Sequence, residues 1–569
     1  MYLYTPRRAA LALLCALMVL FFASSCEKES PSVGSDQNHI LSFSFNELPV
    51  PIKAEVDTVQ RLISARVPSQ LDLSKLVPSI EVSSGATISP KSGQPNDFSK
   101  ETIYKVYSKS GRIANYFVQL SKVEDINSIT YFNLPDLFQT SQISGNTISF
   151  RLPFGTDLSA VKVEFDKPQN ATTPFQSGET VNLANIKEFK VVSAFGTPKT
   201  YSLNITFEPQ ETGIRGVWLT NVASDVLTSR KKIADAMQLL SDLNFNTVFV
   251  VTWNKTQTPY PSKVLQKAIA PLNDPTIQTH FYGDGRDVLQ EVIEEAHSRG
   301  LKVIAWFEYG FAAQYGSANG GRNSVLQAHP EWESRDQQGR IANKNEFYWM
   351  NAFHPEVQQF MTDLVLEVVT NYDIDGIQGD DRLPAVSSSA GYDDYTVSLY
   401  KAQNNGQAPP VGEQNQTWVQ WRSDILNRYA VDLYKKVKAI KPKCLVTYSP
   451  SPYSFSFYNY CQDWPAWIRD NVVEALSPQL YRRDDQGISV YQSLLNTNLG
   501  YAQNKTSIFY PGVLLMLGSY LPSDAFLVQM IRSNRAKGVM GEVYFFYEGV
   551  PRKQKVFKAM YPGKAKFPI

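Results

Sequence analysis

Four carboxylates and one arginine stand within twelve residues in the segment DIDGIQGDDRLP, residues 373–384. Like charges this close together destabilise a fold unless they are solvated, paired or used in a reaction. The apolar Ile-Gly core of the segment is typical of a buried strand, which places Asp380 and Asp381 at its end, directly before Arg382. Two adjacent acids beside an arginine can have their pKa values pushed apart, so that one stays ionised and one is able to donate a proton.

The alternation of side chains along a strand predicts which of these groups point inward. Gln378 and Asp380 face one side, and Ile377 faces the other, where we expect it to pack on a helix layer. We therefore expect Asp380, and Asp381 in the loop that follows, to have a functional role; the alternative is a salt bridge with the next arginine that only closes a loop. Asp375 lies deeper in the strand, and we expect it to have a structural role.

The region that contains this segment alternates between strand and helix patterns. Eight short apolar runs predict strands at 213–220, 246–253, 301–310, 374–381, 444–450, 474–481, 506–513 and 538–546. Helical periodicity fills the gaps, for example at 286–300, where Gly300 is expected to end the helix. Eight such units over 213–569 predict an α/β fold of the TIM (β/α)8 barrel type. A doubly wound open sheet is the alternative, but no Gly-rich phosphate loop follows the first strand.

Active sites of such barrels lie at the carboxyl ends of the strands, and these ends are rich in acids, amides and aromatic rings. This combination suits a sugar, because rings stack on its apolar faces, amides hold its hydroxyls and two carboxyls perform acid–base chemistry. We expect Asp381 or Asp380 to act with Glu548 as the catalytic pair, and Glu308 is an alternative candidate for this pair. Glu542 is another alternative candidate, but its position within the last strand favours a buried structural role.

The remaining candidates at the strand ends are substrate-binding residues. Rings are expected to serve as sugar platforms and amides as hydroxyl partners, although simple packing is the alternative for each of them. The candidate binding residues are Trp253, Asn254, Trp306, Gln378, Arg382, Tyr448, Gln479 and Tyr481.

The N-terminus has the pattern of a targeting signal. Arg7 and Arg8 precede an apolar run at 9–22 that is shorter than the ~20 residues needed to cross a bilayer, which favours a signal peptide over a membrane anchor. The sequence ASSC at 23–26 is similar to a bacterial lipobox, so residues 1–25 are expected to be removed and Cys26 to be lipidated. The alternative is a plain secretory signal. Residues 26–38 would then tether the protein to the outer membrane of a Gram-negative cell envelope.

An internal repeat follows the tether. ISARVPSQLDLSKL at 63–76 recurs as ISFRLPFGTDLSAV at 148–161, an offset of 85 residues. Short alternating strand patterns broken by Gly, Pro, Asn and Ser predict two tandem antiparallel β-sandwich modules of immunoglobulin-like size, at 39–124 and 125–208. The modules resemble the DUF5018 type found in secreted proteins of Bacteroides-like bacteria. Neither carries a cluster of catalytic residue types, so we expect spacers; glycan binding is the alternative.

Composition excludes several classes of partner. A formal net charge of +1 in 569 residues gives no reason to expect nucleic acid. The five histidines show no metal-ligand spacing, so we expect no metal and no cofactor; His354 is expected to open a helix before Pro355. Cys444 and Cys461 permit one disulfide in the mature body. We expect a monomer.

Several motifs together carry a family resemblance. GVWLTNV, YDIDGIQGDDRLP, GYDDYTVSLY, YSPSPYSF, QDWPAWIRDNVVEALSPQLYR and FFYEG, in this order over about 213–550, resemble the glycosyl-hydrolase-like family 10 proteins, also called DUF187. The resemblance implies a TIM-barrel glycoside hydrolase, and some relatives act on peptidoglycan glycan strands stripped of peptide. The family commonly has an aromatic residue or a histidine where this chain has Arg382, which leaves the substrate and the proton partner of Asp381 open.

The function predicted from the sequence is hydrolysis of the glycosidic bonds of a polysaccharide or a peptidoglycan strand. One alternative is a surface lipoprotein that captures glycans on a degenerate barrel, without turnover. Another is a deacetylase or other hydrolase on the same scaffold, which would need a metal site or an activated nucleophile such as Ser449.

Overall fold

The computed structural model describes residues 36–568. The chain forms two compact units: one extends to Ser128 and includes residues 168–173 and 191–199, and the other holds 129–167, 174–190 and 200 to the C-terminus. The eight strands predicted after residue 213 all form, and they lie in one parallel sheet. They are β18 (Arg215–Leu219), β19 (Thr247–Val251), β20 (Lys302–Phe307), β24 (Gly376–Asp380), β25 (Leu445–Ser449), β26 (Ala475–Leu476), β27 (Gly512–Leu514) and β28 (Glu542–Phe545).

The order of the strands gives the sheet a TIM-like barrel topology. Neighbours follow the order β26-β25-β24-β20-β19-β18-β28-β27, so every strand except the pair β26 and β27 is joined to its neighbours in sequence, and β18 also pairs with β28. Two further parallel bridges, Leu476 with Phe509 and Gln479 with Gly512, join the two ends of this order. The carboxyl ends of all eight strands therefore meet on one face.

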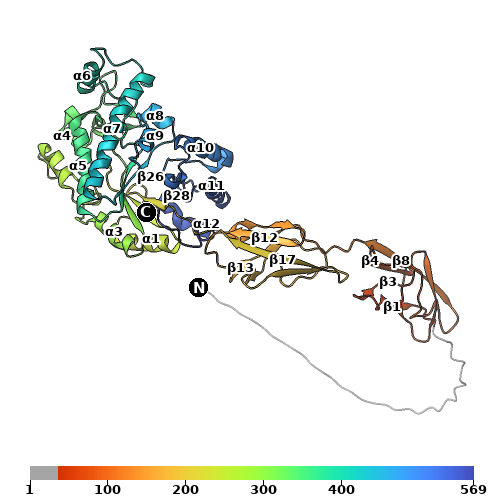
Figure 1. Cartoon of the computed structure of the whole chain (residues 1–569). Helices are drawn as coiled ribbons and strands as arrows, with labels where there is room; N and C mark the ends of the chain where they lie inside the picture. Colours follow the sequence, from red (N-terminus) through yellow and green to blue (C-terminus); the bar gives the residue numbers. More distant parts are fainter. Residues whose placement is uncertain (1–35, 569) are drawn as a thin grey trace, which may run out of the picture. The chain divides into compact units, whose positions relative to one another are not determined.

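Helices follow the strands and surround the sheet (Figure 1). Their buried faces consist of Leu, Val, Ile, Met and aromatic side chains, which form one continuous core with the strands. The helices are α1 (Arg230–Asp242), α2 (Lys263–Ile269), α3 (Val288–His297), α4 (Ser324–Ala328), α5 (Pro355–Asn371), α6 (Asp394–Gln403), α7 (Gln416–Ile440), α8 (Phe455–Tyr460), α9 (Trp464–Arg469), α10 (Ile488–Tyr501), α11 (Asp524–Ala536) and α12 (Gln554–Met560).

The helix ends follow from local sequence chemistry. The side chain of Ser229 accepts a hydrogen bond from Lys232 N at the start of α1, and α5 begins as predicted at Pro355, directly after His354. Gly300, predicted to end α3, has a φ of 75°. Its N–H donates to His297 O at 3.0 Å, and the next N–H donates back to Ala296 O at 3.0 Å, which satisfies the last carbonyls of the helix.

A hydrogen bond between two buried side chains crosses the interior of the barrel. The indole Nε1 of Trp218 donates to Gln378 Oε1 at 2.7 Å. Since β18 and β24 are not neighbours in the sheet, this hydrogen bond crosses the barrel interior. Gln378 therefore faces inward, as the strand alternation predicts.

The longest insertion follows β20 and lies beside the carboxyl ends of the strands. It contains a small antiparallel sheet made of β21 (Ala312–Tyr315), β22 (Asn343–Lys344) and β23 (Phe347–Trp349), in the order β21-β23-β22. Helix α4 and two 3-10 turns, Ala318–Gly321 and Pro330–Trp332, complete the insertion.

The segment predicted as the first β module contains two sheets. One has the order β2-β1-β5 and the other β3-β4-β8-β7-β6. The strands are β1 (Ile40–Phe45), β2 (Ile52–Lys53), β3 (Glu55–Asp57), β4 (Leu62–Pro68), β5 (Ser79–Val82), β6 (Thr87–Ser89), β7 (Thr102–Tyr107) and β8 (Ile113–Val123). Inward-facing rings such as Phe43, Phe98 and Tyr104 fill a separate core. The pair β4–β8 is parallel, so the expectation of a purely antiparallel module is wrong.

The second segment repeats this arrangement. Its strands are β9 (Phe132–Leu134), β10 (Gln139–Thr140), β11 (Gln142–Ser144), β12 (Thr147–Leu152), β13 (Val161–Lys162), β14 (Glu164–Phe165), β15 (Thr180–Val181), β16 (Glu188–Val192) and β17 (Pro198–Phe207). The parallel pair β12–β17 places Ile148 opposite Leu203, and β4–β8 places Ile63 opposite Val118. Both members of the pair shift by the 85 residues of the sequence repeat, so the repeat extends to the strand register.

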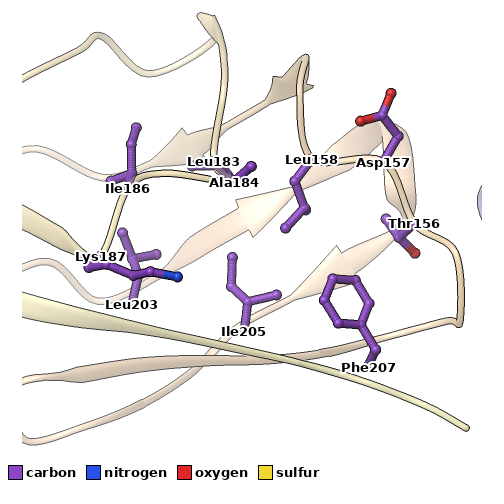
Figure 2. Close-up of a pocket in the computed structure, with 10 residues that line it drawn as sticks. All are labelled: Thr156, Asp157, Leu158, Leu183, Ala184, Ile186, Lys187, Leu203, Ile205 and Phe207. Atoms are coloured by element: carbon purple, nitrogen blue, oxygen red, sulfur yellow. The ribbon is translucent and has the colours of Figure 1, made fainter.

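A cavity of about 330 Å³, lined by aliphatic side chains together with Thr156, Asp157 and Lys187, lies in the second segment (Figure 2). The side chains of Leu158 and Ile205 point toward one another across it, and the carboxylate of Asp157 points away.

Candidate active site

Arg382 lies at the centre of three carboxylates at the carboxyl ends of β20 and β24. Its Nη2 atom is 3.1 Å from Asp380 Oδ2 and 3.8 Å from Glu308 Oε1, and its Nη1 atom is 3.2 Å from Asp381 Oδ1. The side chains of all four residues are largely buried, with exposures between 4% and 14%. One cation thus holds three acids together, as the crowded sequence segment requires.

The backbone and two rings hold the guanidinium in place. Arg382 Nε donates to Glu308 O at 3.0 Å, and its Cζ lies 4.6 Å from the ring centre of Phe347 and 5.4 Å from that of Tyr309. The carbonyl of Arg382 accepts from Phe311 N at 2.9 Å. Gly310, with a φ of 49°, permits this approach, because a Cβ there would lie 2.2 Å from that carbonyl oxygen.

Each carboxylate has its own set of neutral partners. Asp380 Oδ1 accepts from Ser449 Oγ at 3.0 Å and from Gln479 Nε2 at 2.7 Å, while Glu308 Oε2 accepts from Asn254 Nδ2 at 2.7 Å. The two amides predicted to bind sugar hydroxyls therefore position carboxylates. Asp381 has weaker support, from Ser451 Oγ at 3.4 Å.

Burial raises the pKa of two of these acids. The pKa of Asp380 lies well above its ordinary value because of desolvation first and the neighbouring Asp381 charge second, and Arg382 only partly opposes them. Desolvation also raises the pKa of Glu308, against the positive charge of Arg382 and the hydrogen bond from Asn254. The cluster can therefore retain a proton at a pH at which an ordinary carboxyl would have lost it.

Glu548 lies outside this cluster. It belongs to the 3-10 helix Tyr547–Arg552 after β28, and its Oε1 accepts from Ser224 Oγ at 2.6 Å. Within residues 36–568 it makes no hydrogen bond or ion pair with the three acids. The structure thus joins Asp380 and Asp381 to Glu308 rather than to Glu548.

The predicted aromatic residues divide into two groups. Trp253 is fully buried, packs on Phe360 and donates its Nε1 to Gly310 O at 3.0 Å, and the buried Tyr448 packs on Trp467 of α9 at 4.4 Å. Neither offers a ring face to a sugar, so the expectation that they bind substrate is not met.

Two further rings lie inside or at the mouth of the barrel. Trp306 is 2% exposed and packs beside Trp218, with ring centres 6.2 Å apart. Tyr481 is half-buried and stacks on Phe545 at 5.3 Å. Desolvation and the charges of Asp380 and Asp381 raise its pKa, and Tyr481 follows Gln479, which donates to Asp380, by two residues. Of the predicted platforms, Tyr481 is the one positioned beside the cluster.

The sequence did not indicate Phe347 and Ser451 as residues of the site, and it offered Ser449 only as an activated nucleophile. Ser449 pairs in register with Asp380 across β24 and β25, and the same alternation that was applied to β24 would have selected it in place of Tyr448. Phe347 comes from the insertion after β20, and Ser451 follows β25 in a loop; neither stands in a periodic pattern that could have identified it.

Two other acids have structural partners, as expected. Asp375 accepts from Lys302 Nζ at 2.8 Å and from Val303 N at 2.9 Å, and it lies 2.9 Å from His297 Nε2. Glu542 is fully buried and pairs with Arg535 Nη1 at 2.8 Å. Asp375 directly precedes β24, and Glu542 is the first residue of β28. Both carboxylates therefore belong to the amino-terminal ends of the strands, away from the mouth of the barrel.

Comparison with known proteins defines the class. A profile described as glycosyl hydrolase-like 10 matches residues 213–512, more than half of the chain, and the chain belongs to this family. A second profile, described as SGBP, N-terminal, matches residues 40–120 and thus covers the first strand-rich segment.

Two curated relatives are similar over the barrel. The chain is 25% identical over 289 residues to the glycosyl hydrolase DigH of Escherichia coli K12, which is 47% of this chain and 62% of the relative. It is 22% identical over 329 residues to the glycosyl hydrolase YngK of Bacillus subtilis, which is 52% of this chain and 60% of the relative. The chain thus spans about three fifths of the length of these relatives. Among solved structures, the PgaB (BpsB) glycoside hydrolase domain from Bordetella bronchiseptica aligns with 62% of this chain and 99% of its own, at 12% identity and a TM-score of 0.48.

The state of the cysteines, possible membrane spans and possible metal ligands were also predicted from the sequence. Cys444 and Cys461 are buried and free, without a disulfide between them. Within residues 36–568, no helix has the length and apolar character required to span a bilayer. No group of three His, Cys, Asp or Glu side chains in the same range is arranged to hold a metal ion. The predicted signal peptide at 1–25 and the predicted lipidation of Cys26 lie outside the described residues.

Proposed function

We propose that the protein hydrolyses glycosidic bonds with a carboxyl pair formed by Glu308 and Asp381. The observation that carries this proposal is the cluster of three acids around Arg382 at the mouth of a family-typical barrel. The raised pKa of Glu308 suits it to donate a proton. Its Oε1 accepts no hydrogen bond from any of residues 36–568, and the Arg382 guanidinium lies 3.8 Å away, so this oxygen is the one that can carry the proton.

In this mechanism Glu308 transfers its proton to the glycosidic oxygen as the bond to the anomeric carbon breaks. Asp381, paired with Arg382 and with few other partners, supplies the negative charge that attacks the anomeric carbon or takes a proton from the attacking water. Asp380 is held by three donors and is 4% exposed. We assign it the task of fixing Arg382 and thereby the other two acids.

The sugar would bind above this cluster. Tyr481 supplies the stacking face beside the acids, and Asn254 and Gln479 act indirectly by orienting Glu308 and Asp380. A hydrolase with an activated serine receives no support, because Ser449 is buried and its hydroxyl is engaged with Asp380.

The remaining parts of the chain fit a protein at the cell envelope. The profile over residues 40–120 supports a glycan-associated surface protein. The two strand-rich segments would then be immunoglobulin-like spacers between the barrel and a lipid anchor on Cys26. DigH and YngK are both named as glycosyl hydrolases. A polysaccharide or a peptidoglycan strand is the substrate class that we propose here.

A reducing-end assay tests the proposal. The purified protein is incubated with peptide-free peptidoglycan strands and a panel of plant and host polysaccharides, beside Glu308→Gln, Asp381→Asn and Glu548→Gln. Turnover that the first two substitutions abolish and the third leaves largely intact would support the assigned pair. Glycan binding without turnover, unchanged in all three variants, would overturn the proposal and favour a glycan-capturing protein.

A further inference from the structure

Two neighbouring cavities lie between the insertion that connects β20 to α5 and the loops that follow β19 and β24. The first has a volume of about 460 Å³, and its walls include Lys255, Gln314, Asn319 and Arg322. The second has about 560 Å³, and its walls include Arg322, Arg335, Arg340 and Tyr348. Arg322 lines both cavities, so the two adjoin at this side chain.

The first cavity begins next to the acid cluster. Lys255 is one of its walls, and it directly follows Asn254, whose Nδ2 donates to Glu308 Oε2 at 2.7 Å. A glycan chain bound at Glu308 would therefore continue along the insertion toward Arg322. The amides of Gln314 and Asn319 along this route suit sugar hydroxyls.

One buried carboxylate holds two arginines in the wall of the second cavity. The side chain of Glu333 is fully buried and pairs with both Arg322 and Arg335; its Oε2 is 2.6 Å from Arg335 Nη2. Both arginine side chains are 39% exposed. Two guanidinium groups share one carboxylate, so the three side chains together carry a net charge of about +1 at the cavity.

The guanidinium of Arg322 keeps a free binding edge. Its Nε is engaged with Glu333, whereas Nη1 and Nη2 donate no hydrogen bond to any of residues 36–568. Planar guanidinium groups bind carboxylates and sulfates through such pairs of donors. Tyr348 supplies an aromatic wall, held flat against Gly321, where a Cβ would lie 2.2 Å from the ring.

We propose that this Arg322–Arg335 pocket is a subsite for an anionic substituent, a carboxylate or a sulfate, on the glycan chain that the acid cluster cleaves. The inference rests on the proposed function and names its substrate class: a glycan that carries acidic groups at intervals. Asp336 and Glu413 also line the pocket. Each is paired with a cation, Asp336 with Arg340 at 2.9 Å and Glu413 with Lys344 at 3.8 Å, so they do not cancel the net positive charge of the two arginines on Glu333.

Isothermal titration of the full-length protein tests this subsite. The carboxylate probe is an oligogalacturonate, compared with its methyl-esterified form, and the sulfate probe is a sulfated dextran oligosaccharide, compared with dextran. We expect one acidic probe to bind about 10-fold to 100-fold more tightly than its neutral counterpart. Which of the two does so identifies the anionic group.

Arg322→Ala is the decisive variant, and Arg428→Ala is its matched control. Arg428 is an exposed arginine on α7 outside both cavities. We expect Arg322→Ala to remove the preference for the acidic probe and Arg428→Ala to keep it. Glu333 retains Arg335 in this variant, and an unchanged melting temperature confirms the fold; Arg322→Gln is measured in the same way in case Arg322→Ala does not fold.

The outcomes separate this inference from the proposed function, because binding is measured without turnover. An Arg322-dependent preference for an acidic probe supports the subsite, even where the reducing-end assay finds no hydrolysis. Equal affinity for acidic and neutral probes overturns it, even where neutral glycans are hydrolysed. An equal loss in Arg322→Ala and Arg428→Ala also overturns it, because attraction to the overall surface charge would then explain the binding.

Discussion

The Nη2 atom of Arg382 lies 3.1 Å from Oδ2 of Asp380, two residues earlier in the chain. Because Arg382 also reaches Glu308 and Asp381, this short ion pair determines where the guanidinium sits relative to both proposed catalytic acids. The charge of Arg382 opposes the effect of burial on the pKa of Asp380 and of Glu308. Arg382 therefore sets the position of these acids and moderates their protonation.

Replacing Arg382 should lower activity and move its pH dependence. In Arg382→Gln the pKa of Glu308 rises further, because burial remains and the opposing charge is lost. Glu308 acts in its protonated form, so the alkaline limb of the kcat/KM profile moves to higher pH, while kcat/KM itself falls about 10²-fold to 10³-fold. Arg382→Lys keeps the charge and should leave the limb in place with partial activity. An unchanged limb in Arg382→Gln would contradict the role of Arg382 in the protonation of Glu308.

Glu308→Gln and Glu548→Gln separate the two acids that the sequence offered as partners of Asp381. The amide of Gln can still accept the hydrogen bond from Asn254, so we expect Glu308→Gln to fold normally while kcat/KM falls about 10²-fold to 10⁴-fold. Glu548→Gln changes a contact with Ser224 outside the cluster and should retain most of its activity. Initial rates at saturating and limiting substrate decide between them; the reverse pattern would return Glu548 to the catalytic pair.

The eight strands could be predicted from the sequence because each carries a short apolar run between helical periods. Strand alternation also predicted correctly that Gln378 faces the interior, where it meets Trp218. The same rule, applied to β25, would have chosen Ser449 over Tyr448, which packs on Trp467 instead. Tyr448 was expected at the site because tyrosine rings often stack on sugars, although the strand alternation directs its side chain away from the barrel interior.

The partners of the acids were harder to predict. Asn254 and Gln479 were expected at the site, but sequence alone does not show whether an amide faces a sugar or a neighbouring carboxylate. Phe347 contacts Arg382 from a hairpin far away in the chain, in an insertion without regular periodicity. Such contacts depend on how a long loop folds back, which no local pattern records.

Trp253 and Tyr481 should respond differently to truncation. Trp253 is fully buried in the core, so Trp253→Ala should lower the free energy of unfolding by about 3–5 kcal/mol. Tyr481→Ala removes a half-buried ring beside the acids and should weaken glycan binding about tenfold, with little change in melting temperature. Thermal melting and affinity electrophoresis on each variant test the assignment. Loss of binding in a stable Trp253→Phe variant would restore Trp253 as a sugar platform.

Cys26→Ser tests the proposed anchor. A lipidated cysteine holds a protein in the membrane fraction, so the variant should move to the soluble periplasmic or secreted fraction when the full chain is expressed in a Gram-negative host. Cys444→Ser, which changes a buried free thiol in the barrel, serves as the control and should stay with the membrane. Equal membrane recovery of both variants would contradict lipidation at Cys26.

Asp375 should contribute stability that depends on pH in a defined direction. Burial raises its pKa, but the hydrogen bonds from Lys302, Val303 and His297 outweigh this effect, so its pKa in the folded state lies below the ordinary value. A lowered folded pKa means that the stabilisation is present above the unfolded value of about 3.9 and is lost as the pH falls through the folded pKa.

We therefore expect Asp375→Asn to lower the free energy of unfolding at pH 7 by about 1–3 kcal/mol, and expect this difference to shrink toward zero in acid. Urea unfolding at pH 7 and near pH 3 provides the measurement. Asp373→Asn is the matched control: its side chain is 82% exposed, although it lies 3.2 Å from Lys441, and exposed ion pairs contribute little. A penalty for Asp375→Asn that is the same at both pH values would show that packing, and not the charge of Asp375, stabilises the base of β24.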